Sequence, residues 1–405
     1  MRLLGVFGKD VTVTNAASFG SMLGSTIGEP FIVGSDARFG SLPMKFALSS
    51  GLLSAGCNVA DLGFVPSPVL ARAAREERVW GLHFSSDPYP PEYVGVKVYD
   101  PSGKPWDGRL DPHEGDRVGR LASIDLVPNY MGELMDMYDP EPVRVVVDSA
   151  NGPTGQVVPA LLRSMGLQVM EVNSSLSPVT SRGYEPSADS LRDLEFIVRR
   201  KRADLGVAFD GAGSKAGFVV PGAYISAGRA MALLMKFNGF DRVVADYGAT
   251  DLLDLVGVVE RVPASEVRLA ERLHAKGFEV GGGTMGVMFS EWSFAPDGIM
   301  LLLELLQAAS KRGETIEALN EQLPENYEMA GMVRCRDPEG AVEDARKSLS
   351  EHELDLREGV KVVFEDGWVW LKPMKGFVRV SAEAGTKKRA RELMELGKSS
   401  IKRYI

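Results

Sequence analysis

Short apolar runs alternate with amphipathic segments along most of the chain. Residues 30–36 form an apolar run of strand length, whereas residues 42–56 carry apolar positions at helical spacing and end at a glycine. The same alternation predicts strands at 57–63 and 79–85 and a helix at 66–77. Repeated strand–helix–strand units predict a mostly parallel sheet covered by helices on both faces.

The alternation of strand and helix segments begins again twice after residue 137. The polar stretch "MYDPEP" is followed by an apolar strand at 143–152. Further strands are predicted at 167–175, 204–213, 241–248 and 286–290. Further helices are predicted at 153–166, 190–203, 227–239, 266–277 and 297–313.

The C-terminal part has a different pattern. Residues 359–373 read as a hairpin around the turn "EDG", because Asp-Gly is a strong hairpin signal. A strand at 376–384 and an amphipathic helix at 386–404 follow. These elements predict a small antiparallel α+β unit after three α/β units. The predicted domains are 1–137, 138–220, 221–325 and 326–405.

Length and charge narrow the class of protein. A chain of 405 residues with 44% hydrophobic and 25% charged residues predicts a globular protein of several domains. The net charge of -9 disfavours nucleic acid and anionic membranes as partners, because both require clustered cations. A phosphorylated metabolite remains compatible, since a few local cations are enough to hold it.

Cysteine content and the start of the chain point to a cytoplasmic location. Cys57 and Cys335 are far apart and predict neither a disulfide framework nor a metal cluster. The start "MRLLGVFGKD" lacks the apolar run of a signal peptide, and no apolar stretch approaches the ~20 residues of a membrane span.

The most distinctive polar segment is "SSDPYPPEYVGVK", residues 85–97. Two hydroxyl side chains, Ser85 and Ser86, precede Asp87 and a proline-rich turn, and the strand after the turn carries Lys97. The segment fits a phosphoryl-transfer loop with an altered centre, and it also fits an ordinary turn with a solvated lysine.

A series of motifs resembles the α-D-phosphohexomutase superfamily, which includes phosphoglucomutases and phosphomannomutases. These motifs run in order along nearly the whole chain: "FIVGSDAR", "GLLSAGCNVADLGFVPSPVLARA", "PPEYVGVKVY", "VRVVVDSANG", "ADLGVAFDG", "PDGIMLLLELL" and "EDGWVWLKP…VRVSAEA". The resemblance implies three related α/β/α domains with mixed sheets and a small C-terminal α+β domain, heart-shaped around a central cleft. It also implies transfer of a phosphoryl group between the C1 and C6 oxygens of a hexose, with a phosphoserine and Mg²⁺.

The first family loop, T-A-S-H-N-P-P-E-Y-N-G-I-K, falls on residues 85–97. Asp87 then stands where the family has its phosphorylated serine, and Lys97 matches the family lysine near the reacting phosphate. Asp brings about one negative charge where a phosphate brings roughly two. An aspartyl phosphate needs activation by a metal, and Ser86 serves as nucleophile only if the loop shifts.

The metal and sugar loops are also altered. The family's D-G-D-G-D-R is "DGAGSK" here, which keeps Asp210 as the one carboxylate, a poor set of ligands for a divalent cation. The sugar loop G-E-x-S-G-H becomes "GGTMG", with Gly283, Met285 and Val287 at the family's hydrogen-bonding positions. A hexose held there leaves hydroxyls unpaired, or the glycine-rich loop cradles an anion with its backbone N–H groups.

The phosphate loop R-P-S-G-T-E-P becomes "KPMKGFVR". Lys372 replaces the arginine, and Lys372, Lys375 and Arg379 fit either a basic patch for an anion or a charged hairpin tip. Near the start, Val13 stands where the family has an arginine.

Framework motifs are therefore kept while all four functional loops differ. The leading hypothesis is a family member that has lost ordinary mutase activity, a pseudoenzyme that needs no cofactor. Its partner would be an active paralogue, a second copy of the chain or a phosphorylated small molecule. The rival is an active phosphotransferase or phosphatase on an unusual phosphorylated sugar, using Mg²⁺. The retained Asp36, Arg38, Lys97 and Asp210 favour the rival, although Asp36 and Arg38 fit a structural ion pair equally well. A third reading is a structural subunit that exposes an interface.

Overall fold

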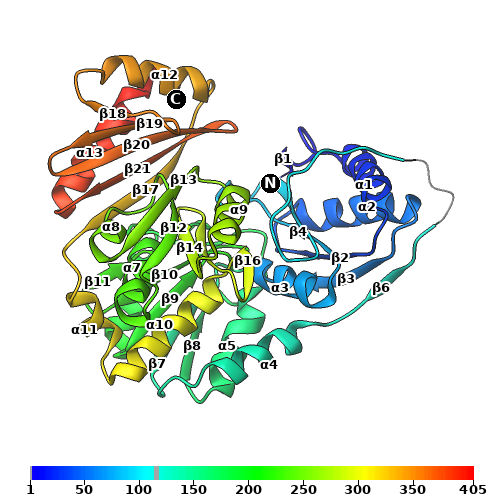
Figure 1. Cartoon of the computed structure of the whole chain (residues 1–405), viewed down its shortest axis with the longest axis horizontal. Coiled ribbons are helices and arrows are strands. Elements are labelled where there is room, and N and C mark those ends of the chain that lie inside the picture. Colours follow the sequence, from blue (N-terminus) through cyan, green and yellow to red (C-terminus); the bar gives the residue numbers. More distant parts are fainter. Residues whose placement is uncertain (1, 114–117) are drawn as a thin grey trace.

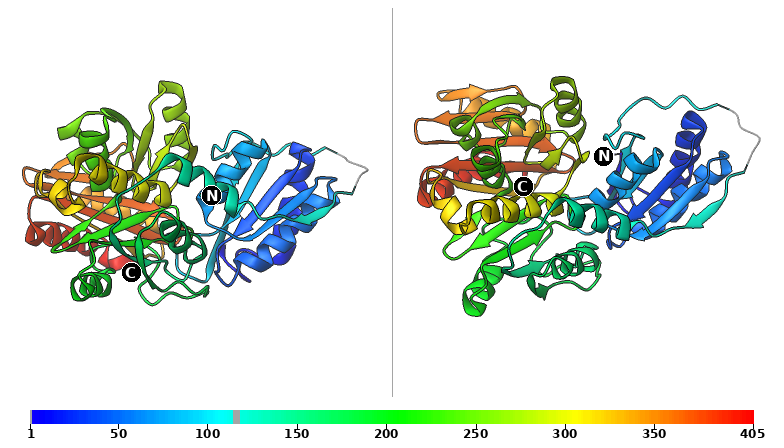
Figure 2. Two further views of the ribbon diagram at one scale, coloured as in Figure 1. Left: turned by 90° about the horizontal axis from the view of Figure 1, so that it is seen from below. Right: turned by 60° about the horizontal axis from the view of Figure 1, so that its bottom comes forward.

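The computed structural model describes residues 2–113 and 118–405. Within them, four β-sheets follow one another along the sequence. Figure 1 shows the first sheet on one side of the molecule and the other three gathered on the opposite side. Figure 2 shows the same division from two further directions. In the described residues, none of the helices has both the length and the apolar character that a membrane crossing requires.

The first sheet is mixed, with parallel strands inside and antiparallel strands at one edge. Its order is β1-β5-β4-β2-β3-β6, and β5 runs antiparallel to both β1 and β4. The strands are β1 (Arg2–Val6), β2 (Phe31–Ser35), β3 (Val59–Phe64), β4 (Trp80–Phe84), β5 (Tyr93–Tyr99) and β6 (Leu121–Ser123). The helices of this part are α1 (Val13–Ile27), α2 (Ser41–Ser54) and α3 (Ser67–Glu77).

Helices α1 and α2 pack closely because glycines lie between them. A Cβ on Gly20 would stand 2.1 Å from the carbonyl oxygen of Leu48, and one on Gly51 would stand 2.1 Å from that of Ala17. Only glycine fits such backbone approaches. The sequence analysis did not predict α1, whose glycine, serine and threonine content gives it a low intrinsic helix propensity.

The second sheet has the order β11-β10-β9-β7-β8. Its strands are β7 (Arg144–Asp148), β8 (Gln168–Val172), β9 (Leu205–Phe209), β10 (Ala216–Val220) and β11 (Ala223–Ile225). Helices α4 (Val127–Met137), α5 (Thr154–Ser164) and α6 (Arg192–Lys201) belong to the same stretch of chain. Because β11 pairs with β10, this sheet extends beyond residue 220, where the sequence analysis placed a domain boundary.

The third sheet has the order β13-β12-β14-β15-β16 and is also mixed. Its strands are β12 (Arg242–Asp246), β13 (Val258–Val262), β14 (Val280–Gly283), β15 (Gly286–Phe289) and β16 (Ser293–Pro296). Its helices are α7 (Ala227–Asn238), α8 (Leu252–Val256), α9 (Glu266–Lys276), α10 (Gly298–Arg312) and α11 (Ile316–Glu321).

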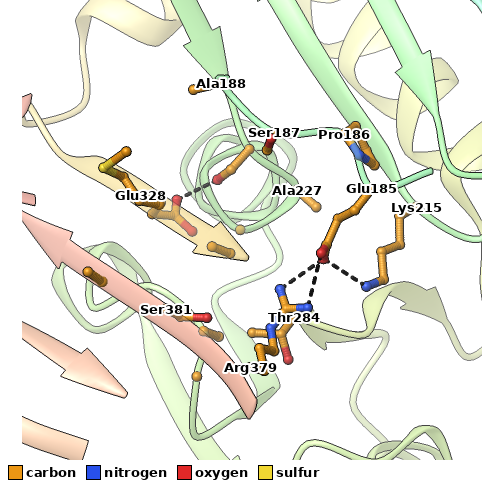
Figure 3. Close-up of a pocket in the computed structure, with 18 of the residues that line it drawn as sticks. Glu185, Pro186, Ser187, Ala188, Lys215, Ala227, Thr284, Glu328, Arg379 and Ser381 are labelled. Carbon is orange, nitrogen blue, oxygen red and sulfur yellow. Dashed lines mark hydrogen bonds and ion pairs between the residues drawn. The ribbon is translucent and has the colours of Figure 1, made fainter. Parts of the chain in front are cut away.

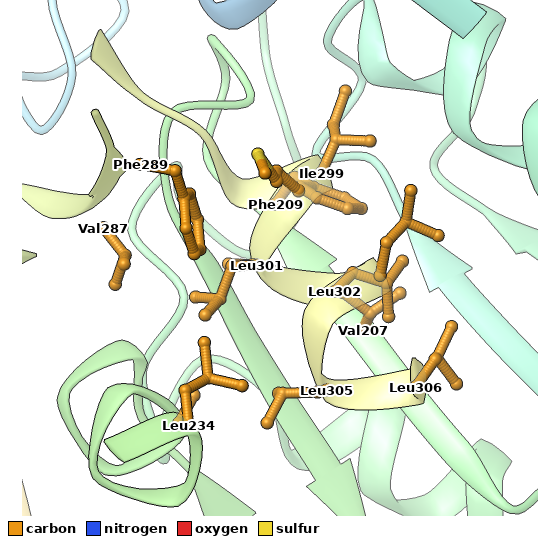
Figure 4. Close-up of a cluster of buried hydrophobic side chains, with 14 of the residues drawn as sticks. Val207, Phe209, Leu234, Val287, Phe289, Ile299, Leu301, Leu302, Leu305 and Leu306 are labelled. Atoms are coloured by element: carbon orange, nitrogen blue, oxygen red, sulfur yellow. The ribbon is translucent and has the colours of Figure 1, made fainter. Parts of the chain in front are cut away.

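The second and third sheets share one hydrophobic core around α10. Figure 4 shows leucines of α10 between Val207 and Phe209 of β9 on one side and Phe289 of β15 and Leu234 of α7 on the other. The run "GIMLLLELL" is apolar round most of the helix, with Glu304 as the exception, which is the pattern of a helix buried between two layers.

The fourth sheet is fully antiparallel, in the order β17-β21-β20-β19-β18. Its strands are β17 (Tyr327–Arg334), β18 (Glu353–Asp355), β19 (Val360–Phe364), β20 (Gly367–Met374) and β21 (Phe377–Ala384). Helices α12 (Pro338–Ser348) and α13 (Lys387–Ser400) cover one face, and a 3₁₀ turn (Lys402–Tyr404) ends the chain. The predicted hairpin, α/β units and terminal helix are confirmed, although the helix ends at Ser400.

The two faces of β21 have different chemistry, and both are buried. Apolar residues such as Val378 and Val380 point into the core under α12 and α13. The alternate residues Arg379, Ser381 and Glu383 belong to the opposite face and are also buried, each with no more than 6% of its surface exposed. The polar face of the fourth sheet is therefore an internal surface against the second and third sheets.

Candidate functional site

Arg38 is the centre of the first candidate site. It follows β2, and because β2 and β4 are parallel neighbours, their following loops lie at the same edge of the sheet. One guanidinium nitrogen donates to Ser86 Oγ at 2.7 Å and to the carbonyl oxygen of Tyr89 at 2.6 Å, and another pairs with the Asp87 carboxylate. Arg38 Nε lies 3.1 Å from Asp36 Oδ2. The predicted ion pair of Asp36 and Arg38 is present, and it includes Asp87.

The second domain closes over this centre. The ring of Tyr184 lies 3.9 Å from the guanidinium carbon of Arg38. Burial raises the pKa of Asp36 to about 7, although Arg38 lies beside it. Asp36, Arg38 and Asp87 are all buried, so one guanidinium faces two carboxyl groups away from water.

The hydroxyl groups beside Asp87 are both engaged. Ser86 Oγ accepts from Arg38 and donates to the carbonyl oxygen of Tyr93 at 2.8 Å. Ser85 Oγ lies 3.2 Å from His83 Nδ1, while His83 Nε2 lies 2.8 Å from the carbonyl oxygen of Val65. Since a carbonyl only accepts, Nε2 carries the proton. Burial lowers the pKa of His83 to about 3, so the imidazole is neutral and Ser85 donates to Nδ1.

Asp210, at the metal-loop position, lies close to Asp87. Its Oδ2 accepts from Ser214 Oγ at 2.6 Å. Burial, followed by the negative charge of Asp87, raises the pKa of Asp210 to about 6. Ala212 and Ser214, which replace the other two family aspartates, are buried as well.

Lys97 contacts a different domain. Its Nζ donates to Glu266 Oε1 at 2.7 Å, and Glu266 is the first residue of α9. Burial alone would lower the pKa of Lys97, but the Glu266 carboxylate outweighs burial and raises it. Lys97 is therefore a buried cation with an internal counter-ion, not the solvated lysine of the alternative interpretation.

The three residues at the sugar-loop positions, Gly283, Met285 and Val287, lie in three different environments. Val287 lies in the core shared by the second and third sheets, and Met285 packs beside Trp368 and Trp370. Gly283 has φ of 133° and lies against the Asp246 carboxylate, where a Cβ would stand 2.7 Å from Asp246 Oδ2. None of these three side chains offers a polar group to a sugar.

The three predicted phosphate-loop cations do not form one patch. Lys372 donates to the carbonyl oxygen of Ala264 at 2.7 Å and pairs with Glu358 at 2.6 Å, whereas Lys375 bonds the carbonyl oxygen of Leu4. Arg379 instead pairs with Glu185. In this structure each of the three cations therefore reaches a different part of the chain, and the phosphate-binding role stays a prediction.

Glu185 is the main site residue that the sequence analysis missed. It lies in the loop between β8 and α6, and its carboxylate receives Arg379 at 2.8 Å and Lys215 at 3.3 Å (Figure 3). Burial opposes its ionisation, but the two cations outweigh burial and lower the pKa of Glu185 to about 2. Nothing in the local string "SRGYEPSADS" marks this role, because both partners are distant in sequence.

Glu185, Lys215 and Arg379 line a cavity of about 90 Å³ where the second, third and fourth sheets meet. We call it the junction cavity. Its other polar lining includes Thr284, Glu328 and Ser381. The Arg38 centre does not line this cavity, so the cleft region contains two separate polar clusters.

The chain is a multidomain α/β protein in which loops from several sheets meet in buried charged clusters. The family models for phosphoglucomutase/phosphomannomutase α/β/α domains I and II match residues 3–111 and 129–222. The chain belongs to the phosphoglucomutase/phosphomannomutase family of the α-D-phosphohexomutase superfamily.

Relatives match over almost the full length. A "Phosphoglucomutase/phosphomannomutase" of Thermococcus kodakarensis is 27% identical, over 98% of this chain and 97% of the relative. The structure of a phosphoglucomutase/phosphomannomutase family protein from Burkholderia thailandensis has a TM-score of 0.80 at 21% identity, over 99% of this chain and 95% of that one. The fold predicted from the sequence is confirmed.

The superfamily implies Mg²⁺, and the donor set here does not fit it. An Aspergillus fumigatus N-acetylphosphoglucosamine mutase, with a TM-score of 0.55 and 14% identity over 92% of this chain and 82% of its own, was solved with GlcNAc-6P and magnesium. In residues 2–113 and 118–405 of this chain, no group of three or more His, Cys, Asp or Glu is placed to hold a metal ion. Asp210 and Asp87 supply only two carboxylates, and cations lie close to both. This is a poor set of ligands for Mg²⁺, which several carboxylate or phosphate oxygens usually hold.

Proposed function

We propose that this chain is a phosphohexomutase-family protein without ordinary phosphohexomutase activity, which acts through what it binds. The observation that carries the proposal is the pairing of Arg38 with Asp87 at the position of the family's phosphoserine. A carboxylate already neutralised by a buried guanidinium has no phosphoryl group to donate and little tendency to attack one.

The surrounding charges support the proposal. Phosphoryl transfer depends on positioned cations that neutralise the migrating group. Here Lys97 is paired with Glu266, Arg379 with Glu185 and Lys372 with Glu358. The cations at the family's loop positions are thus each paired with a carboxylate of the chain itself. The pairs Lys97–Glu266 and Arg379–Glu185 join different domains.

The size of the junction cavity agrees with this view. Ligand sites usually enclose roughly 300–1,000 Å³. The cavity of about 90 Å³ is much smaller than a bound hexose phosphate requires. This cavity by itself does not hold a hexose phosphate in the described structure.

An isomerisation assay tests the proposal. The purified chain would be incubated with glucose 1-phosphate or mannose 1-phosphate, Mg²⁺ and a bisphosphate activator, beside an active phosphoglucomutase as positive control. We expect no formation of the 6-phosphate above a blank without protein. Turnover comparable with that of the control enzyme would overturn the proposal.

One observation favours a second candidate, an active phosphotransferase. Ser85 donates to the neutral imidazole of His83, and a hydroxyl bonded to a neutral imidazole is the arrangement of an activated nucleophile. The relatives named as mutases point the same way. Incubation with a hexose bisphosphate followed by intact-mass measurement decides: a phosphoryl adduct that Ser85→Ala removes and Ser86→Ala keeps would establish this candidate.

The partner class is also part of the proposal. A second copy of the chain and an active paralogue are the expected protein partners. Size-exclusion chromatography with light scattering separates a monomer from a homo-oligomer. Co-purification from the native cell identifies a paralogue.

A further inference from the structure

Two acidic residues lie directly opposite each other on the internal face of the fourth sheet. Glu328 of β17 and Glu383 of β21 are partners in the antiparallel register, and side chains at such positions share one face of a sheet. Glu383 is 6% exposed, and Glu328 is partly buried. Like charges directly opposite each other destabilise a sheet, so this pair needs a compensating group.

Both carboxyl groups reach the third domain. Glu328 Oε1 accepts from the hydroxyl of Ser226, the N-cap residue of α7. Glu383 Oε1 accepts from the backbone N–H of Asp251 at 3.0 Å, and Asp251 is the N-cap residue of α8. The pair therefore lies at the contact between the fourth sheet and the N-termini of two helices of the third domain.

The cations near the pair are engaged by other groups. The other charged residues around it are Arg229, Asp246, Asp251, Arg261 and Lys361. Arg229 donates to residues 320–324, Arg261 pairs with Asp254, and Lys361 Nζ lies 3.5 Å from Asp251 Oδ1. In residues 2–113 and 118–405, neither Glu328 nor Glu383 has an ion-pair partner, and Glu383 Oε2 is buried without a hydrogen-bond partner.

A shared proton removes the repulsion between the two carboxyl groups. Burial, followed by the negative charge of Glu328, raises the pKa of Glu383 to about 8, and burial also raises the pKa of Glu328. Carboxyl groups that share a buried site titrate as a pair, and one of them keeps its proton. Because the folded-state pKa is raised, the stabilising effect of this proton is complete below pH 4.5 and disappears as the pH rises through about 8.

We propose that Glu328 and Glu383 form a proton-dependent latch between the third and fourth domains. While the pair shares one proton, it carries a single negative charge and the fourth sheet stays docked on the N-termini of α7 and α8. At alkaline pH the proton passes to solvent, the pair carries two negative charges, and their repulsion loosens the contact. Since Glu328 also lines the junction cavity, the width of that cavity changes with the latch (Figure 3).

A distance measurement between the two domains tests the latch. Spin labels would be attached to full-length protein carrying Ala275→Cys on α9 and Lys388→Cys on α13, both exposed, while the native Cys57 and Cys335 are buried. Double electron–electron resonance at pH 6.5 should give one distance. At pH 9.5, where the protonated fraction of a group with a pKa of about 8 has fallen about thirtyfold, a second, longer distance should appear.

Glu383→Gln keeps the shape of the side chain and removes the ionisation, so we expect the single short distance at both pH values. Glu328→Gln should behave in the same way. Glu353→Gln on exposed β18 is the matched control and should keep the wild-type response.

Identical distances at pH 6.5 and pH 9.5 in the protein without these substitutions would overturn the proposal, as would a longer distance at pH 9.5 that persists in Glu383→Gln. If Glu383→Gln does not fold, Glu328→Gln decides. No sugar phosphate is present in these measurements, so their outcome is independent of the isomerisation assay.

Discussion

The Arg38 centre and the junction cavity are two buried polar clusters that leave different atoms without hydrogen-bond partners. Around Arg38, these atoms include the carboxylate oxygens Asp87 Oδ2 and Asp210 Oδ1 and also the donor Arg38 Nε, counted among the described residues. Around the junction cavity, the unpaired atoms are mainly donors. The first cluster gathers three carboxyl groups around one guanidinium, whereas the second places one carboxylate between two cations.

The two clusters are balanced differently. Around Arg38, one guanidinium pairs with the Asp87 carboxylate, so this part of the first domain is held by an internal ion pair. In the junction cavity, Glu185 pairs with both Arg379 and Lys215 and offsets one of their two positive charges, and it leaves a volume of about 90 Å³ unfilled. The Arg38 cluster is held by ion pairs in packed surroundings, whereas the cluster at the junction cavity is held by ion pairs around an unfilled volume.

Loss of Arg38 is expected to have the largest effect. Arg38→Met leaves Asp36 and Asp87 buried without their cation and costs about 3–5 kcal/mol of unfolding free energy. Urea unfolding followed by circular dichroism measures the loss. The exposed Arg200→Met is the control, with a change below about 0.5 kcal/mol. A loss below about 1 kcal/mol in Arg38→Met would show that this centre does not hold the fold.

Loss of Arg379 should cost less, because Glu185 keeps Lys215. We expect Arg379→Met to lower the unfolding free energy by about 2–3 kcal/mol. A double-mutant cycle with Glu185→Gln should give a coupling energy of about 1–2 kcal/mol. Additive losses in the double variant would contradict the pairing.

The two clusters should respond to pH in opposite directions. Because the folded-state pKa of Asp210 is raised to about 6 from 3.8, the folded state binds a proton that the unfolded state has lost. Its contribution is complete below pH 4 and disappears as the pH rises through 6. Glu185, with its pKa lowered to about 2, contributes above pH 4.5 and loses that contribution as the pH falls towards 2.

Asp210→Asn should therefore remove about 1–2 kcal/mol of the change in unfolding free energy between pH 4 and pH 6. Unfolding curves at a series of pH values measure this slope. Glu185→Gln should alter the profile mainly from pH 4.5 down to pH 2 and leave it unchanged near pH 6. An identical pH profile in the wild type and Asp210→Asn would refute the raised pKa of Asp210.

The smallest expected difference separates two neighbouring tryptophans. Trp370 Nε1 donates to the carbonyl oxygen of Glu358 at 2.7 Å, whereas Trp368 Nε1 has no acceptor among the described residues. Trp370→Phe should cost about 1 kcal/mol more than Trp368→Phe in phosphate-free buffer. Thermal unfolding of both variants provides the comparison, and the reverse order would show that Trp368 Nε1 is satisfied.

Much of the fold could be predicted because its signals are local. The alternation of apolar runs and helical spacing located β2, α2, β7 and α10, since periodicity depends on neighbours along the chain. The anchor "PPEY" aligned Asp87 and Lys97 with a family motif because that motif is a short contiguous stretch of chain. Helix α1 was missed because glycines chosen for packing against α2 weaken its helical signal.

The candidate site was predicted only in part. The sequence identified Asp87, Asp210 and Arg379 as members of the cleft, and it identified the loss of the family's metal and sugar ligands. It gave no indication of Glu185, Glu266 or Tyr184 as their partners. These residues come from other domains, and no local pattern connects them.

By itself, the sequence determined many of the elements, their order and the chemical type of each loop position, because these depend on short stretches of chain. Only the tertiary structure decided which charges meet. Arg379 and Glu185 are 194 positions apart, and packing of the fourth sheet on the second brings them together. The alternation in β21 suggests one buried and one solvated face, yet the polar face is buried too, because other domains cover it.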